Sequence, residues 1–301
     1  MKILHVDTGR DMRGGQIQAL LLMEGLREAG HECLLMARKE SAIRSVASTS
    51  GFTVVSLGLL EIYRQSRLAD LVHAHDSHSH TLAAIASRAP FVISRRVAFP
   101  VKRSIPSKWK YQRGRRFLAV SQFVARELVA AGLSSEKIDV VYDGVQLSKT
   151  VDFWQPSNPA VALATADPQK GRTIVERAAH VAGIPVVFSY DLSRDFQNAS
   201  MFVYITRSEG LGSAALLAMS MGIPVIASQI GGLTEVLEDG VSGLLVRNEP
   251  EEIATCMRRV RNNPAFAATL REGGRQRVSK MFTKQLMVER TITSYVRALA
   301  D

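Results

Sequence analysis

The chain has 301 residues, 46% of them hydrophobic, and a formal net charge of +10. This length and composition fit one large or two medium globular domains and argue against a disordered chain. No apolar run reaches the roughly 18–20 residues that a helix needs to cross a bilayer, and the N-terminus lacks the long apolar segment of a signal peptide. The expected location is therefore cytoplasmic, with peripheral binding to the inner face of the membrane as an option.

Short apolar runs alternate with amphipathic helical patterns through the first half of the chain. This alternation is typical of a parallel sheet with helices on both faces. A helix is expected to open at Gly14-Gly15, and another to be capped by Ser121. Pro100 and Pro106 predict that part of the basic segment around them is a loop. The expected strands are 3–7, 33–36, 52–55, 71–75, 91–94, 117–120 and 138–142.

The composition changes near residues 152–159, which are rich in proline and polar residues and favour a linker. Strands are expected after it at 160–166, 186–189, 202–205, 225–227 and 244–246. The predicted fold is α/β, with two Rossmann-like domains whose parallel sheets face a central cleft, where such sheets bind ligands. The predicted domains are 1–150 and 151–283. A final helix covers 284–301, and its packing against the N-terminal domain is one option.

Two glycines, Gly14 and Gly15, lie between the first expected strand and the first expected helix. They allow backbone N–H groups to approach a phosphate or a sugar, and the helix N-terminus adds positive potential there. The dinucleotide fingerprint G-x-G-x-x-G is absent. An ordinary tight turn is the alternative interpretation.

The segment from Ser208 to Val236 carries the strongest signal. A strand is expected to end at Ile205, and a glycine-containing loop leads to a helix that starts near Leu211. The free N–H groups of residues 210–213 are suited to hold a diphosphate, and Glu209 is placed to bind sugar hydroxyls. Further along, Gly231-Gly232 permits a close approach of the backbone. The alternative is a helix start and turns that serve only the fold.

This segment resembles the donor-site signature of the family-4 (group 1) retaining glycosyltransferases of the glycosyltransferase B fold. The signature has Glu-Gly-x-Gly, Gly-x-Pro-Val and Gly-Gly-x-x-Glu, and the matching residues are Glu209–Gly212, Gly222–Val225 and Gly231–Glu235. Weaker matches follow in the same order as in the family: Asp70–His75, Phe117–Ser121, Val140–Val145 and Asp239–Val246. The resemblance covers nearly the whole chain, with a shortened C-terminal domain.

The resemblance implies roles for individual residues. Glu209 is expected to contact the transferred sugar, Lys170 the diphosphate, and Arg95 the reacting end of the donor, which makes these three the expected catalytic residues. Leu217 stands where the family has a glutamate that contacts the ribose, and the family's diphosphate arginine is missing before Lys170. The implied donor-binding residues are Gly14, Gly15, Lys170, Glu209, Gly210, Leu211, Gly212, Ser213 and Leu217.

Arg95 and Arg96 end the fifth expected strand, and two guanidinium groups suit a phosphate or a carboxylate. With His75 and Asp76 they form the predicted acceptor-binding set, against the alternative of a solvated basic patch. His73, His75, His78 and His80 have spacings that a metal site could use. No acid or cysteine cluster completes such a site, and the family generally needs no metal, so no metal and no cofactor are predicted.

No acidic residue occurs between Asp76 and Glu127, whereas basic residues are frequent there. The basic segment 95–116 also contains Trp109 and Tyr111. This combination suits an anionic membrane surface, where aromatic residues lie at the headgroups. A solvated loop and helix is the alternative. No RNA-binding signature is present, and nucleic acid is not a predicted partner.

The resemblance implies transfer of a sugar, with retention, from a UDP- or GDP-linked nucleotide-sugar to a glycan or lipid-linked acceptor. Lipopolysaccharide or another cell-envelope glycan is the expected product. The substitution at Leu217 and the missing arginine leave open a second interpretation, a non-catalytic binding or partner protein with a degenerate nucleotide site. The oligomeric state is left open.

Overall fold

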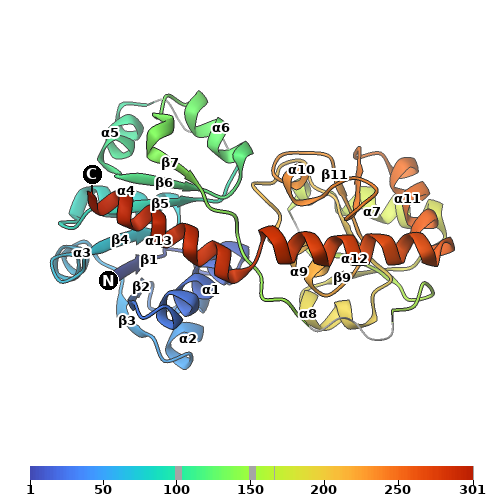
Figure 1. The fold of residues 1–301 in the computed structure, drawn as a ribbon, viewed down its shortest axis with the longest axis horizontal. Helices are drawn as coiled ribbons and strands as arrows, with labels where there is room; N and C mark the ends of the chain where they lie inside the picture. The colour runs from blue at the N-terminus through green and yellow to red at the C-terminus, as the bar shows by residue number, and fades with distance from the viewer. Residues whose placement is uncertain (99–103, 149–153, 166, 301) are drawn as a thin grey trace. The chain divides into compact units, whose positions relative to one another are not determined.

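The computed structural model describes residues 1–98, 104–148, 154–165 and 167–300 (Figure 1). The chain forms two compact units. Unit 1 comprises Met1–Gly144 and Lys284–Asp301, and unit 2 comprises Val145–Thr283. The boundary thus lies before the predicted one at 150/151. The reason is local, because Val145 already pairs with Thr283 and donates a backbone hydrogen bond of 2.9 Å to Phe282.

The sheet of unit 1 has seven strands in the order β3-β2-β1-β4-β5-β6-β7, and each pairs in parallel with its neighbours. Every strand expected in the first half of the chain is found, with ends within two residues of the prediction. The strands are β1 (Lys2–Val6), β2 (Glu32–Ala37), β3 (Thr53–Ser56), β4 (Leu71–Ala74), β5 (Phe91–Arg95), β6 (Arg116–Ala119) and β7 (Ile138–Val140).

Helices connect these strands, as parallel pairing requires. They are α1 (Gly14–Glu28), α2 (Ala42–Thr49), α3 (Leu59–Ser66), α4 (Ser77–Ala86), α5 (Ile105–Arg113) and α6 (Gln122–Ala130). The helix α3 was not predicted. The helix α5 occupies much of the segment expected to be partly a loop, because Pro106 lies in its first turn, where proline costs no hydrogen bond.

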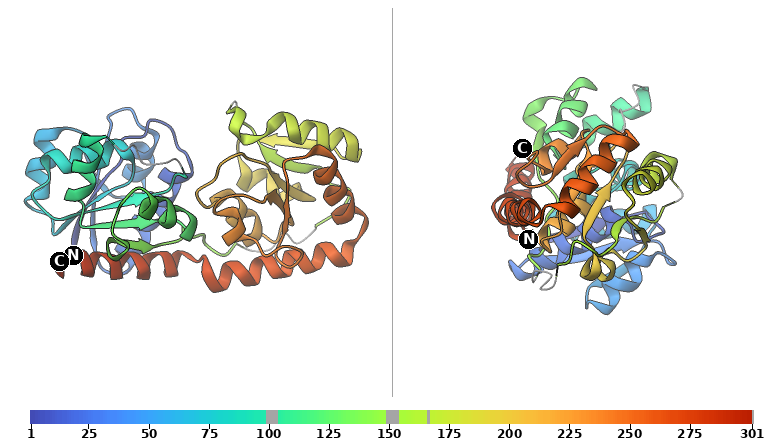
Figure 2. Two further views of the ribbon diagram at one scale, coloured as in Figure 1. Left: turned by 90° about the horizontal axis from the view of Figure 1, so that it is seen from above. Right: turned by 90° about the vertical axis from the view of Figure 1, so that its right-hand side faces the viewer.

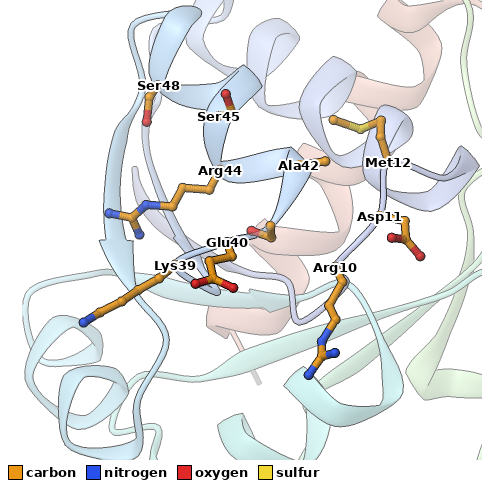
Figure 3. Close-up of a pocket in the computed structure, with 10 residues that line it drawn as sticks. Arg10, Asp11, Met12, Lys39, Glu40, Ala42, Arg44, Ser45 and Ser48 are labelled. Carbon is orange, nitrogen blue, oxygen red and sulfur yellow. The ribbon is translucent and has the colours of Figure 1, made fainter.

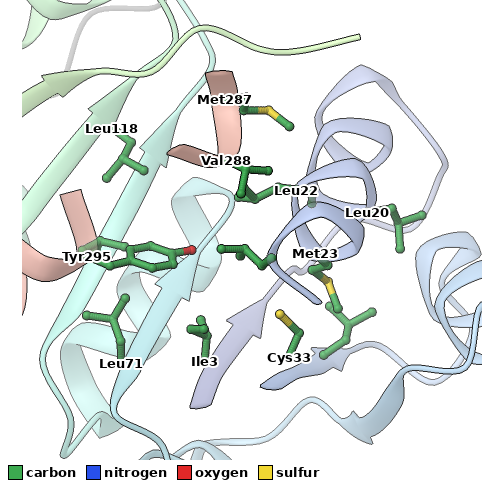
Figure 4. Close-up of a cluster of buried hydrophobic side chains, with 14 of the residues drawn as sticks. Ile3, Leu20, Leu22, Met23, Cys33, Leu71, Leu118, Met287, Val288 and Tyr295 are labelled. Atoms are coloured by element: carbon green, nitrogen blue, oxygen red, sulfur yellow. The ribbon is translucent and has the colours of Figure 1, made fainter. Parts of the chain in front are cut away.

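The C-terminal helix α13 (Lys284–Ala300) belongs to unit 1 and packs against α1, β5 and β6 (Figures 1 and 2). Met287, Val288 and Tyr295 of α13 enter the same buried cluster as Leu22 and Met23 of α1 (Figure 4). The two helices lie so close that a Cβ atom on Gly25 would meet Val288 Cγ2 at 2.4 Å. The helix therefore completes the core of unit 1.

The sheet of unit 2 has five parallel strands in the order β12-β11-β10-β8-β9. They are β8 (Ala160–Leu163), β9 (Val186–Ser189), β10 (Met201–Tyr204), β11 (Val225–Ser228) and β12 (Leu244–Val246). The helices are α7 (Arg172–Ala182), α8 (Leu192–Asp195), α9 (Ser213–Ser220), α10 (Leu233–Val236), α11 (Pro250–Asn262) and α12 (Pro264–Met281). Because the strands are parallel, the loops that follow them gather at one edge of the sheet.

None of the helices within the described ranges is long and apolar enough to cross a membrane.

Candidate donor and acceptor sites

Glu209 lies at the carboxyl edge of the unit 2 sheet, in the loop that follows β10. Its Oε2 atom is 2.7 Å from Lys170 Nζ and also accepts a hydrogen bond from the Tyr204 hydroxyl. Its Oε1 atom accepts a hydrogen bond of 3.1 Å from the Gly210 amide. Three donors from two loops and a strand thus fix the carboxylate.

The surroundings of this carboxylate are largely shielded from water. The side chains of Glu209 and Lys170 are 15% and 25% exposed. Burial, reinforced by the negative charge of Glu209, raises the pKa of Tyr204 well above its usual value, so the phenol keeps its proton and remains a donor. Tyr204 was not predicted, because a tyrosine at the end of a buried strand is indistinguishable in sequence from a core residue.

The loop around Glu209 depends on close backbone contact with the loop after β11. The Gly232 amide donates to the Glu209 carbonyl oxygen at 3.2 Å. A Cβ atom on Gly232 would lie only 2.0 Å from the Gly210 carbonyl oxygen. The close approach expected at Gly231-Gly232 is therefore found, and it is made to the neighbouring loop.

Polar side chains also link the loops that follow β10 and β11. Ser228 Oγ accepts a hydrogen bond from the Thr206 amide at 2.9 Å and donates to Asn248 Oδ1 at 2.6 Å. Asn248 Nδ2 in turn donates to the Thr206 carbonyl oxygen at 2.9 Å. These hydrogen bonds connect the residues that follow β10 and β12 to the last residue of β11 and so fix the loop that carries Glu209.

The helix α9 begins at Ser213, two residues later than expected near Leu211. Its N-cap is Gly212, which has φ +108° and no side chain to cap the helix, and the first turn contains no acid. The Ala215 amide already donates to the Gly212 carbonyl oxygen at 2.9 Å, so the amides of Ser213 and Ala214 are the ones placed to bind an anion at this helix start. The Gly210 amide, expected to serve a diphosphate, is instead used by Glu209.

The structure also shows the two places where the chain differs from the family pattern, Leu217 and the missing arginine before Lys170. Leu217 lies half-buried on α9, and Leu211 is 1% exposed and belongs to the core. Arg172, the only arginine close to Lys170 in sequence, pairs with Glu176 at 2.9 Å and stacks over Phe188 at 4.4 Å. It therefore does not take the place of the missing diphosphate arginine.

In unit 1, Arg96 lies in a buried network. Its Nε atom is 3.0 Å from Asp143 Oδ1, with side chains 14% and 9% exposed. Its Nη1 atom is 3.4 Å from His75 Nδ1. A Cβ atom on Gly15 would lie 4.0 Å from Arg96 Cδ. The structure thus places Gly15, which was expected to bind the donor, close to Arg96 and His75, which were expected to bind the acceptor.

Arg95 lies in a different neighbourhood. Successive side chains at the end of a strand point to opposite faces of the sheet. The positive charge of Arg95 helps to lower the pKa of both His80 and Lys110, whereas that of Arg96 acts on His5 and His75. The expectation that Arg95 and Arg96 bind one anion together is therefore not supported by their placement.

Asp76 serves as the N-cap of α4. Its Oδ1 atom accepts hydrogen bonds from the amides of His78 and Ser79 at 2.8 and 2.9 Å. The Thr8 amide and hydroxyl donate to its two oxygens at 2.7 and 2.8 Å. Four donors thus occupy this carboxylate, which joins the loop after β1 to the start of α4. The sequence had instead suggested that Asp76 contacts an acceptor.

Three histidines, His5, His73 and His75, form a buried group toward the carboxyl ends of the central strands β1 and β4. His5 Nδ1 is 2.9 Å from His75 Nε2, and His73 contacts Tyr295 Oη at 2.6 Å and Ser94 Oγ at 2.8 Å. Burial and the charge of Arg96 lower the pKa of His5 to about 3. His5 was not predicted; the parallel register of β1 and β4 places it beside His73.

One ring nitrogen from each of these histidines lies within 4.8 Å of the other two, a grouping that a metal ion could use. Most of them already take part in hydrogen bonds, and the Arg96 cation nearby opposes a second positive charge. The arrangement therefore favours a neutral hydrogen-bonded core. His78 is exposed, and His80 packs edge-on against Tyr111 at 4.8 Å, so neither joins the group.

The basic segment divides into a structural part and an exposed part. Tyr111 is 9% exposed, Lys110 Nζ donates to Ser77 and Thr81, and Arg116 is buried against Asp139 at 2.6 Å. These residues stabilise unit 1. The exposed residues of α5 include Ile105, Lys108, Trp109 and Arg113, beside Pro106 and Gln112. Residues 99–103 of the predicted surface lie outside the described residues.

Family models match both units. The model described as Glycosyltransferase Family 4 matches residues 12–149, and that described as Glycosyl transferases group 1 matches residues 158–263. Among curated proteins, a D-inositol 3-phosphate glycosyltransferase of Nocardioides sp. is 34% identical over 119 residues, 39% of this chain and 26% of that protein. The capsular polysaccharide biosynthesis glycosyltransferase CapM of Staphylococcus aureus is 27% identical over 101 residues, 33% of this chain and 27% of CapM. The chain thus matches about a quarter of the length of these relatives.

Solved structures agree on the fold. HepE of Anabaena, solved with UDP and glucose, matches 98% of this chain and 99% of its own with a TM-score of 0.84 at 17% identity. Sucrose-phosphate synthase of Thermosynechococcus elongatus matches 99% of both chains with a TM-score of 0.77 at 18% identity. The two parallel-sheet domains are those of the glycosyltransferase B fold, and the chain belongs to the group 1, family-4 glycosyltransferases.

Proposed function

We propose that the chain transfers a sugar from a nucleotide-sugar donor bound in unit 2, with UDP or GDP as the carrier. The observation that carries this proposal is the Lys170–Glu209 pair beside the uncapped start of α9. A cation and free helix amides suit a diphosphate, and a carboxylate suits sugar hydroxyls. No further cofactor or metal is invoked.

The proposed chemistry is largely electrostatic. As the bond between sugar and diphosphate breaks, negative charge builds up on the departing nucleoside diphosphate. Lys170 and the first amides of α9 would stabilise that charge, and such fixed donors are commonly the largest single contribution to catalysis. Glu209 would accept hydrogen bonds from the sugar and so orient its reacting carbon.

Donor binding would rearrange the pair. Lys170 and Glu209 contact each other at 2.7 Å, and a bound diphosphate would compete for the ammonium group. Glu209 Oε2 would then have one lone pair free for a sugar hydroxyl, while Tyr204 still donates to Oε2 and Gly210 to Oε1. Retention of configuration is part of the proposal and rests on the family resemblance.

The proposed acceptor is a glycan or a lipid-linked glycan of the cell envelope, such as lipopolysaccharide. CapM, whose name assigns it to capsular polysaccharide, is among the relatives and supports this class. In unit 1 the neighbouring residues Gly15, His75 and Arg96 are the best supported for contact with the reacting end of the acceptor.

We also propose that the exposed face of α5 contacts an anionic membrane. Ile105 is 85% exposed and Trp109 43% exposed, next to the exposed Lys108 and Arg113. The paired change Lys108→Glu and Arg113→Glu should abolish salt-sensitive flotation with vesicles of anionic lipid, whereas the control Arg126→Glu on α6 should not. Equal flotation of the two proteins would contradict this part of the proposal.

The second candidate is a non-catalytic protein with a degenerate nucleotide site. Leu217 in place of the ribose-binding glutamate and the missing arginine favour it. The test is to follow a panel of UDP- and GDP-sugars by NMR with envelope lipid extract as acceptor. If the unaltered chain releases nucleoside diphosphate and Glu209→Gln does not, the enzyme interpretation is supported. The anomeric signal of the product tests retention of configuration. Binding of donor without any consumption would favour the second candidate.

A further inference from the structure

A groove lies at the carboxyl ends of β1, β2 and β3 in unit 1. Its first hollow, about 690 Å³, is lined by the loop after β1, the loop after β2 and one face of α2 (Figure 3). A second hollow of about 550 Å³ follows the end of β3. Arg44 lines both, so the two form one surface, here named the Arg44 groove. Both hollows are shallow and open to solvent, and the volume of each lies in the range of small-ligand sites.

The first hollow carries an excess of unpaired positive charge. Arg10, Lys39 and Arg44 line it, and none of them forms an ion pair within the described residues. Of its two acids, Asp11 is already 3.3 Å from Arg13. Glu40 is the remaining carboxylate. The hollow can therefore accept an anion without first breaking an ion pair.

Arg44 holds an unsatisfied donor. Its Nη1 atom is buried and has no hydrogen-bond partner among the described residues. A buried donor without a partner is unfavourable, and an acidic oxygen bound nearby would remove that cost. The side chain stands on α2 at the junction of the two hollows, where a ligand extending from one to the other would pass.

The rest of the lining suits a sugar. Ser45 and Ser48 are exposed on one face of α2, and Glu40 supplies a carboxylate that accepts hydrogen bonds from hydroxyl groups. The lining of the two hollows contains no aromatic ring, although stacking on such rings is the usual way to bind unpaired bases. Cations, hydroxyls and a carboxylate in one groove fit a polyhydroxylated anion better than a nucleic acid.

We propose that the Arg44 groove binds acidic sugar residues of a glycan, which carry carboxylate or phosphate groups. Arg10, Lys39 and Arg44 bind the acidic groups, and Glu40 with the serines of α2 binds hydroxyls. That this glycan is the acceptor rests on the proposed function; the binding itself does not.

The test is calorimetric titration of the full chain, without nucleotide, with three probes of defined chemistry. They are a hexasaccharide of galacturonic acid, mannose 6-phosphate and the neutral maltohexaose. The affinity of at least one acidic probe should be at least about tenfold higher than that of the neutral probe. Added salt should weaken the binding of the acidic probe. Equal binding of acidic and neutral probes, or no binding of either acid, would overturn the proposal.

Matched variants locate the binding. Lys39→Gln and Arg44→Gln should each lower the affinity for the acidic probe by about tenfold, the loss expected for one charge-assisted hydrogen bond. Arg126→Gln removes the same charge from an exposed position on α6 and should change nothing. Lys39 is exposed, so its variant should fold even where Arg44→Gln does not. Equal losses in all three variants would show unspecific charge attraction and contradict the groove.

The two proposals fail separately. If acidic probes bind and the variants behave as expected but no nucleotide-sugar is consumed, the groove stands and the transferase activity does not. If nucleotide-sugar is consumed while Lys39→Gln and Arg44→Gln bind acidic probes like the unaltered chain, the activity stands and the groove is wrong.

Discussion

Lys170 Nζ lies 2.7 Å from Glu209 Oε2, so the two residues that the family pattern assigns to the diphosphate and to the sugar contact each other directly. The pair is mostly shielded from water, and Tyr204 and Gly210 hold the carboxylate from its other sides. In the donor-free protein the two functional groups therefore neutralise each other. Under the proposed function a donor would have to separate them, and its diphosphate would supply the replacement charge for Lys170.

Replacing the lysine tests this relationship. Lys170→Ala removes a charge-assisted hydrogen bond that is worth about 1.5–3 kcal/mol. The affinity for a nucleoside diphosphate should fall about 10- to 100-fold. Titration calorimetry measures the loss, and Arg172→Ala is the control because Arg172 pairs with Glu176. Equal losses in both variants would place the diphosphate elsewhere.

Leu217 tests whether the altered ribose position weakens the site. The side chain is half-buried on α9, so Leu217→Glu can be accommodated at the surface of the helix. Two new hydrogen bonds to ribose hydroxyls should tighten nucleotide binding about tenfold. Leu217→Met, which adds no acceptor for those hydroxyls, should leave affinity unchanged. No gain in the glutamate variant would mean that no ribose lies beside this residue.

Gly232 tests the loop contact. A methyl group there would lie 2.0 Å from the Gly210 carbonyl oxygen, so Gly232→Ala has to displace the loop that carries Glu209. Nucleotide binding should fall, and the free energy of unfolding should drop by about 1–3 kcal/mol, as in overpacked sites. Gly58→Ala is the control, because its Cβ would meet only Glu61 Cβ at 4.0 Å. Unchanged binding in Gly232→Ala would contradict the role of the contact.

The buried histidines predict acid sensitivity. The pKa of His5 is lowered from 6.5 to about 3, and those of His73 and His75 are also lowered, chiefly by burial. Below pH 6.5 the unfolded chain binds protons that the folded chain does not, so folding stability is lost as the pH falls. Each histidine contributes at most about 1.4 kcal/mol per pH unit.

Urea unfolding between pH 5 and pH 8 measures this dependence. His5→Asn should reduce the slope below pH 6.5 by about one proton. The raised pKa of Asp7 acts in the opposite direction, because its folded form binds a proton more readily than its unfolded form. A stability that is constant from pH 8 to pH 5 would show that the histidines are not neutral in the folded protein.

Much of the fold could be predicted, because buried parallel strands leave continuous apolar runs such as Phe91–Ile93 and Val225–Ala227. The helix α3 was missed because it has only eight residues, fewer than the window over which helical periodicity stands out, and its apolar Leu60 is 62% exposed. The helix α5 was obscured by Pro106, whose place in the first turn is visible only once the helix start is known.

The sites were predictable where a motif carried them. Glu209 and Lys170 follow from the family pattern, but their contact spans 39 residues and needs the tertiary fold. The sequence also could not assign Arg95 and Arg96 to different faces of the sheet, because this assignment depends on where β5 ends. Asp76 was expected to bind the acceptor, and its capping of α4 was not foreseen, since a cap and a site acid have the same local sequence. The Arg44 groove joins three loops and leaves no linear motif.

The central claim, a nucleotide site built on Glu209 and the start of α9, is tested most directly by titration calorimetry. The unaltered chain and Glu209→Gln are titrated with UDP, GDP and their sugar conjugates at up to millimolar concentration. The account predicts that one nucleotide family binds, and that Glu209→Gln weakens the sugar conjugate more than the free diphosphate. Absence of binding by every nucleotide, or equal weakening of both ligands, would contradict it.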